Sequence, residues 1–159
     1  MLFRSDEVVR FNLAELVSGC VQGYQLAYPE HQFNLSIVSD DIPVTGIAEM
    51  FAQLLDKLVD NAAEFASTPE IGISLDTEND RAYLRVTNEG PGLPEAMTGQ
   101  LFDAMVSVRA GQAETHLGLG LYVARLIADF HGAAISISNR EDVPGVMVLV
   151  EVPLLRITS

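Results

Sequence analysis

The sequence predicts an α+β fold, a two-layer α/β sandwich with a mixed, mostly antiparallel sheet of about five strands and helices on one face. Three observations predict it. The chain has 159 residues, enough for about one domain. Along the chain, some segments have apolar residues at helical spacing and others have apolar residues at every second position, as in a strand. Its strand-like segments cluster in pairs, whereas a doubly wound parallel sheet needs stricter alternation of strand and helix.

The first half of the chain reads as helix, strand, helix. Apolar residues recur at helical spacing over residues 13–27, and residues 33–39 alternate like a half-buried strand. Residues 40–46, DDIPVTG, are rich in breakers and are predicted to be a loop. Residues 46–66 form the clearest helix, with one broad apolar stripe. The stripe consists of Met50, Phe51, Leu54, Leu55, Leu58, Val59, Ala62 and Phe65.

The second half supplies most of the sheet. The predicted strands are residues 70–76, 81–88, 133–138 and 146–153, and the predicted helices are residues 99–106 and 118–131. TEND, residues 77–80, is the expected turn of a hairpin. The segment EGPGLP that follows the second of these strands has too much Gly and Pro for either regular structure.

Composition excludes several functions. The formal net charge is −13, which argues against binding to nucleic acid or to anionic lipid, because both require basic surfaces. A metal–nucleotide ligand remains possible, because the local field matters more than the net charge. The single cysteine, Cys20, excludes an intrachain disulfide, and no apolar run approaches the roughly 20 residues that span a bilayer.

Asn61 lies at the border of the apolar stripe of the helix over residues 46–66. A half-buried amide needs polar partners, because unpaired burial costs about 1–3 kcal/mol. Two interpretations are open. Asn61 hydrogen-bonds a neighbouring backbone group, or its oxygen is a ligand for Mg²⁺, which prefers hard oxygen ligands.

Two glycine-rich segments also have two interpretations each. NEGPGLP, residues 88–94, is a plain strand-ending turn, or a bare backbone against which a flat base lies while Asn88 reads its edge. Gly118 and Gly120 begin a helix, whose free N–H groups and positive dipole end favour an anion; alternatively this segment only packs. The segment lacks the third glycine of a dinucleotide fingerprint and the Gly-Lys-Ser/Thr of a Walker loop.

The order of these motifs resembles the ATP-binding domain shared by sensor histidine kinases, type II topoisomerases, mismatch-repair ATPases and a heat-shock chaperone. It is most similar to the catalytic domain of a bacterial sensor histidine kinase. LVDNAAEF resembles the N box, NEGPGLP the first glycine box, LFDAM the F box, and HLGLGLYVARLIADFHGA the second glycine box. The resemblance implies the Bergerat type of sandwich.

The resemblance also implies a site. Asn61 would coordinate the Mg²⁺ that bridges the phosphates of ATP, and Asn88 would face the adenine amino group. A lid over about residues 103–117 would close over the nucleotide, with Phe102 as its hinge. The remaining residues expected to contact the nucleotide are Gly90, Gly92, Leu93, Leu117, Gly118, Leu119 and Gly120.

Some positions depart from the family pattern. Asn88 stands where the family usually has Asp, and Val146 where it usually has Ser or Thr, so adenine recognition is expected to be weaker or rearranged. Glu64 replaces a frequent Lys or Arg, and Lys57 stands four residues before Asn61. Lys57 and Glu64 are an exposed charge pair, or Lys57 supplies a cation to the phosphates. Arg109 in the lid is a second candidate for that cation, or a solvated charge.

The predicted organisation is a lead-in from a missing helical hairpin domain over residues 1–10, an ATP-binding catalytic domain over 11–155 and a tail over 156–159. The predicted function is a protein histidine kinase catalytic domain that uses ATP and Mg²⁺. It would transfer the γ-phosphoryl group to a histidine on the hairpin domain of a homodimeric, membrane-anchored parent, with the domain in the cytoplasm and a response regulator downstream. The alternative is a degenerate nucleotide-binding scaffold with weak or no phosphotransfer. His131 is expected to close its helix, not to accept phosphate.

Overall fold

The computed structural model describes residues 8–92 and 116–155, of which residues 116–119 are described by their backbone alone. The main sheet has five strands in the order β2-β4-β5-β7-β6. Their bounds are β2 Gln32–Ile37, β4 Glu70–Glu78, β5 Arg81–Glu89, β6 Ala134–Asn139 and β7 Gly145–Pro153. β2 pairs with β4 in parallel, and the other pairs are antiparallel. The predicted mixed, mostly antiparallel sheet is confirmed.

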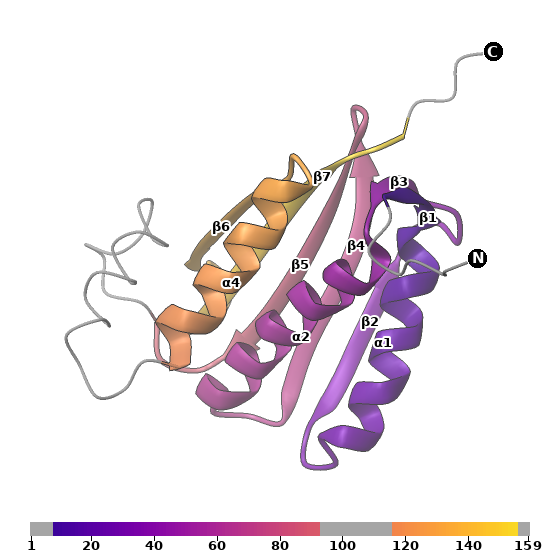
Figure 1. The fold of residues 1–159 in the computed structure, drawn as a ribbon. Helices are drawn as coiled ribbons and strands as arrows, with labels where there is room; N and C mark the ends of the chain where they lie inside the picture. The colour runs from indigo at the N-terminus through magenta and orange to yellow at the C-terminus, as the bar shows by residue number, and fades with distance from the viewer. Residues whose placement is uncertain (1–7, 93–115, 156–159) are drawn as a thin grey trace.

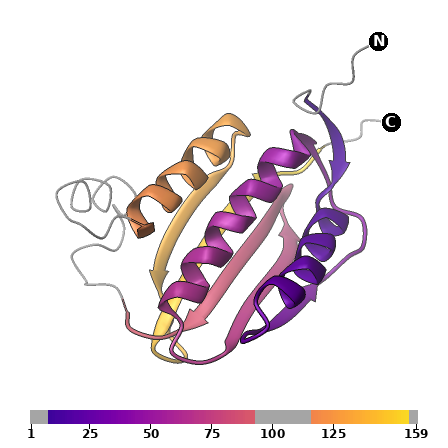
Figure 2. The ribbon, with the colours of Figure 1, turned by 60° about the horizontal axis from the view of Figure 1, so that its bottom comes forward.

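Three helices in the described residues cover one face of this sheet (Figures 1 and 2). They are α1 Leu13–Ala27, α2 Ala48–Phe65 and α4 His116–Phe130. α2 lies between the other two, over the middle of the sheet. The two-layer architecture predicted from the clustered strands is therefore confirmed. The predicted helix at residues 99–106 lies outside the described residues.

A second, two-stranded sheet was not predicted. β1, Val9–Asn12, pairs antiparallel with β3, Pro43–Gly46, in the segment that the sequence predicted to be a loop. That prediction was wrong. Each strand has four residues, and its partner lies more than 30 positions away, so no local pattern reveals the pairing. Pro43 is tolerated because it starts the strand, where no ladder N–H is required.

The predicted turn between β4 and β5 forms within residues 77–80 and is two residues shorter, because β4 continues through Glu78. Glu78 and Arg81 are paired across it, so Asn79 and Asp80 make a two-residue loop. Both have positive φ, 50° and 67°. Asn and Asp tolerate this conformation better than most residues, and it matches the twist of the flanking strands.

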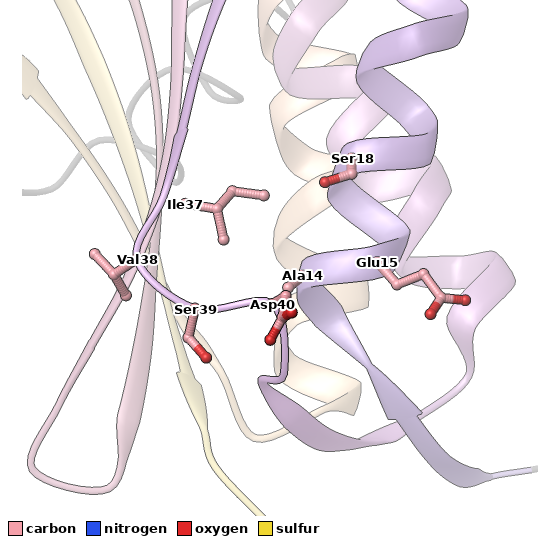
Figure 3. A pocket seen from close by; sticks show the side chains of 7 residues that line it. All are labelled: Ala14, Glu15, Ser18, Ile37, Val38, Ser39 and Asp40. Carbon is pink, nitrogen blue, oxygen red and sulfur yellow. The ribbon is translucent and has the colours of Figure 1, made fainter.

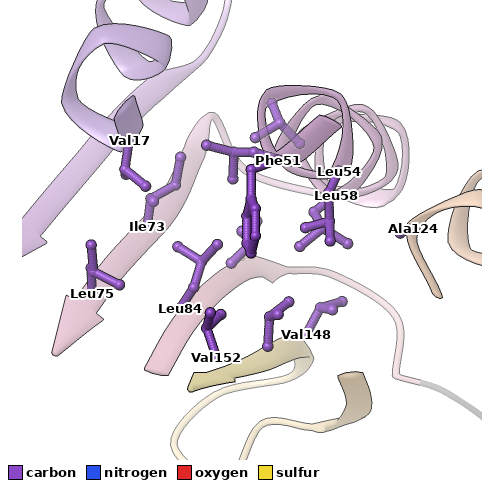
Figure 4. Close-up of a cluster of buried hydrophobic side chains, with 14 of the residues drawn as sticks. Val17, Phe51, Leu54, Leu58, Ile73, Leu75, Leu84, Ala124, Val148 and Val152 are labelled. Carbon is purple, nitrogen blue, oxygen red and sulfur yellow. The ribbon is translucent and has the colours of Figure 1, made fainter. Parts of the chain in front are cut away.

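The core lies between the helices and the sheet (Figure 4). Phe51, Leu54 and Leu58 of α2 point into it, and each is at most 1% exposed. From the sheet side come alternate residues of the strands, among them Ile73, Leu84, Val148 and Val152. Fully burying a side chain of this kind contributes about 1.5–3 kcal/mol, so the buried residues of the predicted α2 stripe stabilise the packing of this helix on the sheet.

His131 connects the end of α4 to the beginning of α2. Its Nδ1 lies 2.8 Å from the carbonyl oxygen of Ile127, and its Nε2 accepts a hydrogen bond of 3.0 Å from the backbone N–H of Ile47. Its ring packs at 4.4 Å against the ring of Phe51. Gly46 must be glycine, because a Cβ there would overlap the imidazole. His131 closes its helix as expected and also fixes the start of α2.

Two tyrosines attach α1 to α2. Tyr24 donates a hydrogen bond of 2.5 Å from its hydroxyl to a carboxylate oxygen of Asp56, and Tyr28 donates one to Asp60. Burial, followed by the hydrogen bond to Asp56, raises the pKa of Tyr24 above its ordinary value of 10.0. The neutral phenol is the form that the fold stabilises.

We expect the fold to lose stability in alkali through Tyr24. A raised folded-state pKa gives a contribution that is present in full below the unfolded-state pKa of about 10 and declines as the pH rises toward the folded-state pKa. The free energy of unfolding should therefore fall steeply above pH 10 in the wild type. Tyr24→Phe should cost about 1 kcal/mol at pH 7 and flatten that fall. Denaturant titrations between pH 7 and pH 11 measure both.

Val150→Ala is the matched control, because it removes buried apolar atoms and no titratable group. Val150→Ala should lower the free energy of unfolding by an amount that does not change with pH. An alkaline decline as steep in Tyr24→Phe as in the wild type would show that this phenol does not carry the effect.

Candidate functional site

Three predicted segments meet at one end of the sandwich. They are the last turns of α2 with Asn61, the end of β5 with Asn88, and the first turn of α4 (Figure 2). α2 packs against both α4 and β5. Segments that are up to about 60 residues apart in the chain thus lie together at one end of the sandwich, as the order of the motifs predicted.

The side-chain oxygen of Asn61 is buried and has no hydrogen-bond partner in the described residues. The alternative role, a hydrogen bond to a neighbouring backbone group, is therefore not what this oxygen does there. Leaving a buried acceptor unpaired costs about 1–3 kcal/mol. A neutral, hard oxygen of this kind fits a Mg²⁺ ion, which keeps most of its waters and takes few protein ligands. No cluster of three His, Cys, Asp or Glu side chains that could hold a metal occurs in the described residues.

Asn88 is almost fully buried, with 2% of its surface exposed, at the last positions of β5. Its cross-strand neighbours are the apolar Ile71 and Val146. Its Nδ2 donates a long hydrogen bond of 3.3 Å to the carbonyl oxygen of Glu89. The assignment of oxygen and nitrogen follows from that bond. One N–H of Nδ2 is engaged in this bond, and Oδ1 is an acceptor of the kind that an exocyclic amino group requires.

The turn after Asn88 is held from two sides. The carbonyl oxygen of Glu89 accepts a hydrogen bond of 2.7 Å from the N–H of Ser67, and the N–H of Gly90 donates one of 3.0 Å to the carbonyl oxygen of Pro144. A Cβ on Gly90 would overlap the carbonyl oxygen of Phe65. Packing therefore requires glycine at this position, and the same requirement leaves the backbone of the turn bare.

α4 begins at His116, two residues earlier than predicted. The first four N–H groups of a helix have no partner within it, so Gly118 belongs to this set and Gly120, the fifth residue, follows it. A Cβ on Gly120 would meet no atom within 4 Å in the described residues. Packing thus does not explain glycine at Gly120, whereas Leu121 and Ala124 just after it are buried.

The other predicted site residues divide into three groups. Lys57 is half-buried and Glu64 is exposed, and neither makes an ion pair in the part of the chain that the structure describes. Leu117 and Leu119 lie in the first turn of α4, which is described by its backbone alone. Leu93, Phe102 and Arg109 lie outside the described residues.

A separate hollow of about 630 Å³ lies at α1 and the end of β2 (Figure 3). Glu15 and Ser18 line it from the helix, and Ile37 and Asp40 line it from the strand and the segment after it. It contains none of the residues predicted for the site.

In the described residues no helix has the length and apolarity needed to cross a bilayer.

Comparison with known families gives one clear match. A family profile described as "Histidine kinase-, DNA gyrase B-, and HSP90-like ATPase" matches residues 46–156. Among curated proteins, the sensor protein KdpD of Escherichia coli K12 is 33% identical over 138 residues, which are 86% of this chain and 14% of KdpD. The sensor histidine kinase YkoH of Bacillus subtilis 168 is 32% identical over 133 residues, which are 81% of this chain and 28% of YkoH.

Solved structures agree. The nucleotide-free catalytic domain of histidine kinase ThkA superposes with a TM-score of 0.77 at 29% identity, covering 92% of this chain and 95% of that one. ThkA in complex with the response regulator protein TrrA gives a TM-score of 0.73 at 26% identity, covering 93% of this chain and 42% of that one. The chain thus matches one catalytic domain along nearly its whole length, but spans less than a third of either curated relative.

We expect Asn61→Leu to stabilise the chain in the absence of ligand, because it replaces a buried acceptor that has no partner in the described part of the chain by an apolar group of similar size. The expected gain in free energy of unfolding is about 1 kcal/mol, measured by urea titration without nucleotide or metal. The matched control is Asn12→Ala, since Asn12 caps α1 by accepting from Ala14 N–H and also accepts from Ile42 N–H. It should cost about 1–2 kcal/mol. If Asn61→Leu is as destabilising as Asn12→Ala, the amide has a structural partner.

Proposed function

Because the chain belongs to the family of histidine kinase-, DNA gyrase B-, and HSP90-like ATPases and is an ATP-binding catalytic domain of the histidine kinase type, we propose a phosphotransfer function for it. In this function the domain transfers the γ-phosphoryl group of Mg–ATP to a histidine on a helical hairpin domain of its parent protein. The observation that carries this proposal is the buried Oδ1 of Asn61, which has no hydrogen-bond partner among the described residues. It stands on α2, where the N box of the family lies.

The phosphate end of the site is formed by α2 and α4. The free N–H groups of the first turn of α4, including that of Gly118, and the positive end of its dipole attract the phosphates. Asn61 offers its oxygen to Mg²⁺, which when bound neutralises phosphate charge during transfer. Lys57, one turn before Asn61 on α2, is the candidate cation for the phosphates. It precedes Asn61, whereas the cation frequent in the family follows the asparagine, at the position of Glu64 in this chain. Phosphoryl transfer requires positioning and charge neutralisation, which these groups supply.

The base end is formed by the end of β5 and the turn that follows. Oδ1 of Asn88 accepts from the amino group of adenine, and the base lies on the bare backbone of Gly90 and Gly92. Asn88 is neutral where the family usually has a carboxylate, and Val146 opposite it has no hydroxyl. Charge-assisted hydrogen bonds are about twice as strong as neutral ones, so Asn88 alone binds adenine more weakly than a carboxylate at the same position would.

We further propose the surroundings of the domain. The catalytic domain includes Val9 and Arg10, which pair with β3, and extends to about residue 155, and the hairpin domain that carries the phosphoacceptor histidine is another part of the parent protein. The parent is a membrane-anchored homodimer with this domain in the cytoplasm, and it passes the phosphoryl group to a response regulator. The complex of ThkA with TrrA supports that last step by analogy.

Incubation of the parent protein with ATP labelled at the γ-phosphate tests the proposal. We expect an acid-labile, base-stable phosphohistidine outside the domain, and no signal for Asn61→Ala. Retention of ADP binding with no phosphohistidine would identify the domain as a nucleotide-binding scaffold and contradict the proposed transfer.

The proposed role of Lys57 gives a separate prediction. Lys57→Ala should weaken binding of both ATP and ADP about tenfold, because a hydrogen bond to a charged phosphate is lost. Lys57→Arg keeps the charge and should recover most of the affinity. Titration calorimetry of the domain measures these constants. Glu64→Gln, on the same helix and exposed, is the control and should not weaken binding. Unchanged affinity in Lys57→Ala would leave the lysine as a solvated surface charge.

A further inference from the structure

Strand register places a second asparagine beside the proposed base site. Asn88 of β5 is paired with Val146 of β7, and Val146 is in turn paired with Asn139 of β6. Directly opposed residues of a sheet point to the same face, so the three side chains form one row on the face that carries the helices. Two strand spacings separate the two amides by about 10 Å.

Each asparagine lies against one of the two glycines of the turn. Nδ2 of Asn88 is 3.3 Å from the position that a Cβ would take on Gly90. Oδ1 of Asn139 is 2.9 Å from the position that a Cβ would take on Gly92, and its Cγ is 3.3 Å from it. The bare backbone on which the base is proposed to lie therefore has an amide at both of its ends. Asn139 is exposed at the end of its strand, so a ligand can reach it.

We propose that Asn139 is a second base-recognition residue, which hydrogen-bonds a ring nitrogen of the purine while Asn88 accepts from the amino group. The inference rests on the proposed function. It explains how the site recognises a base although Asn88 is neutral and Val146, between the two amides, has no hydroxyl. The isopropyl group of Val146 separates the amides, and each amide reads its own edge of the base.

Two ligands that lack part of ATP separate the contacts. Purine riboside triphosphate has the ring nitrogens of ATP and no amino group, and tripolyphosphate has no base. Asn139→Ala should weaken ATP and purine riboside triphosphate equally, each about five- to tenfold, which is the value of one hydrogen bond. Asn88→Ala should make these two nucleotides bind alike. Neither variant should change the affinity for tripolyphosphate with Mg²⁺.

Ser138→Ala is the matched control. Ser138 is the neighbour of Asn139 in β6 and points to the opposite face of the sheet, so the substitution should leave every affinity unchanged. If Asn139→Ala does not fold, Asn139→Leu keeps about the volume of the side chain and removes its hydrogen-bonding groups without adding a charge, and is titrated in the same way.

Gly92→Ala links the turn to Asn139 in a double-mutant cycle. Its methyl group displaces the amide of Asn139, so it should weaken ATP binding in the wild type and add less than twofold in Asn139→Ala. ATP affinity of Asn139→Ala within about twofold of wild type would overturn the inference, as would an equal loss for ATP and tripolyphosphate. Neither result contradicts the proposed function if Asn61→Ala still binds ATP with Mg²⁺ more weakly than the wild type does. A wild type that binds neither ATP nor tripolyphosphate would overturn the proposed function itself.

Discussion

Burial of one face of α2 is the constraint on which the rest of the structure depends. Leu54 and Leu58 are completely buried between the helices and the sheet, which fixes the rotation of α2 about its axis. Successive helix residues differ by about 100° in direction, so a different rotation would turn Asn61 out to solvent. α1 holds this helix through Tyr24, and α4 holds its start through His131. The packing that stabilises the fold therefore also aims the residue proposed to act on phosphates.

Most of the fold could be predicted because its elements have a clear hydrophobic period. The helix predicted at residues 46–66 is Ala48–Phe65 in the structure, and the strand pair around Asn79 and Asp80 forms with the expected turn. β1 and β3 could not be predicted, since four-residue strands have almost no period of their own and form only by pairing with each other. The start of α4 shifted by two residues, which is the usual uncertainty at a helix end.

The site was predictable as a set of motifs and less so as a geometry. Asn61 could be singled out because it borders an apolar stripe, and Asn88 because it begins a glycine-rich turn after a strand, but the sequence alone left open whether Asn61 already had a partner. Asn139 was missed, because its place beside Gly92 follows from register across three strands and not from any spacing in the chain. The net charge of −13 does not exclude such a site, because the local field matters more than the net charge, and the start of α4 and Lys57 are the groups proposed to supply that field.

Asn61 is proposed to couple Mg²⁺ to the bound nucleotide. Calorimetric titration of ATP with and without Mg²⁺, in the wild type and in Asn61→Ala, tests it most directly. We expect Mg²⁺ to tighten ATP binding about tenfold or more in the wild type and to have almost no effect in the variant, while adenosine binds to both equally. The same enhancement by Mg²⁺ in both proteins would contradict it.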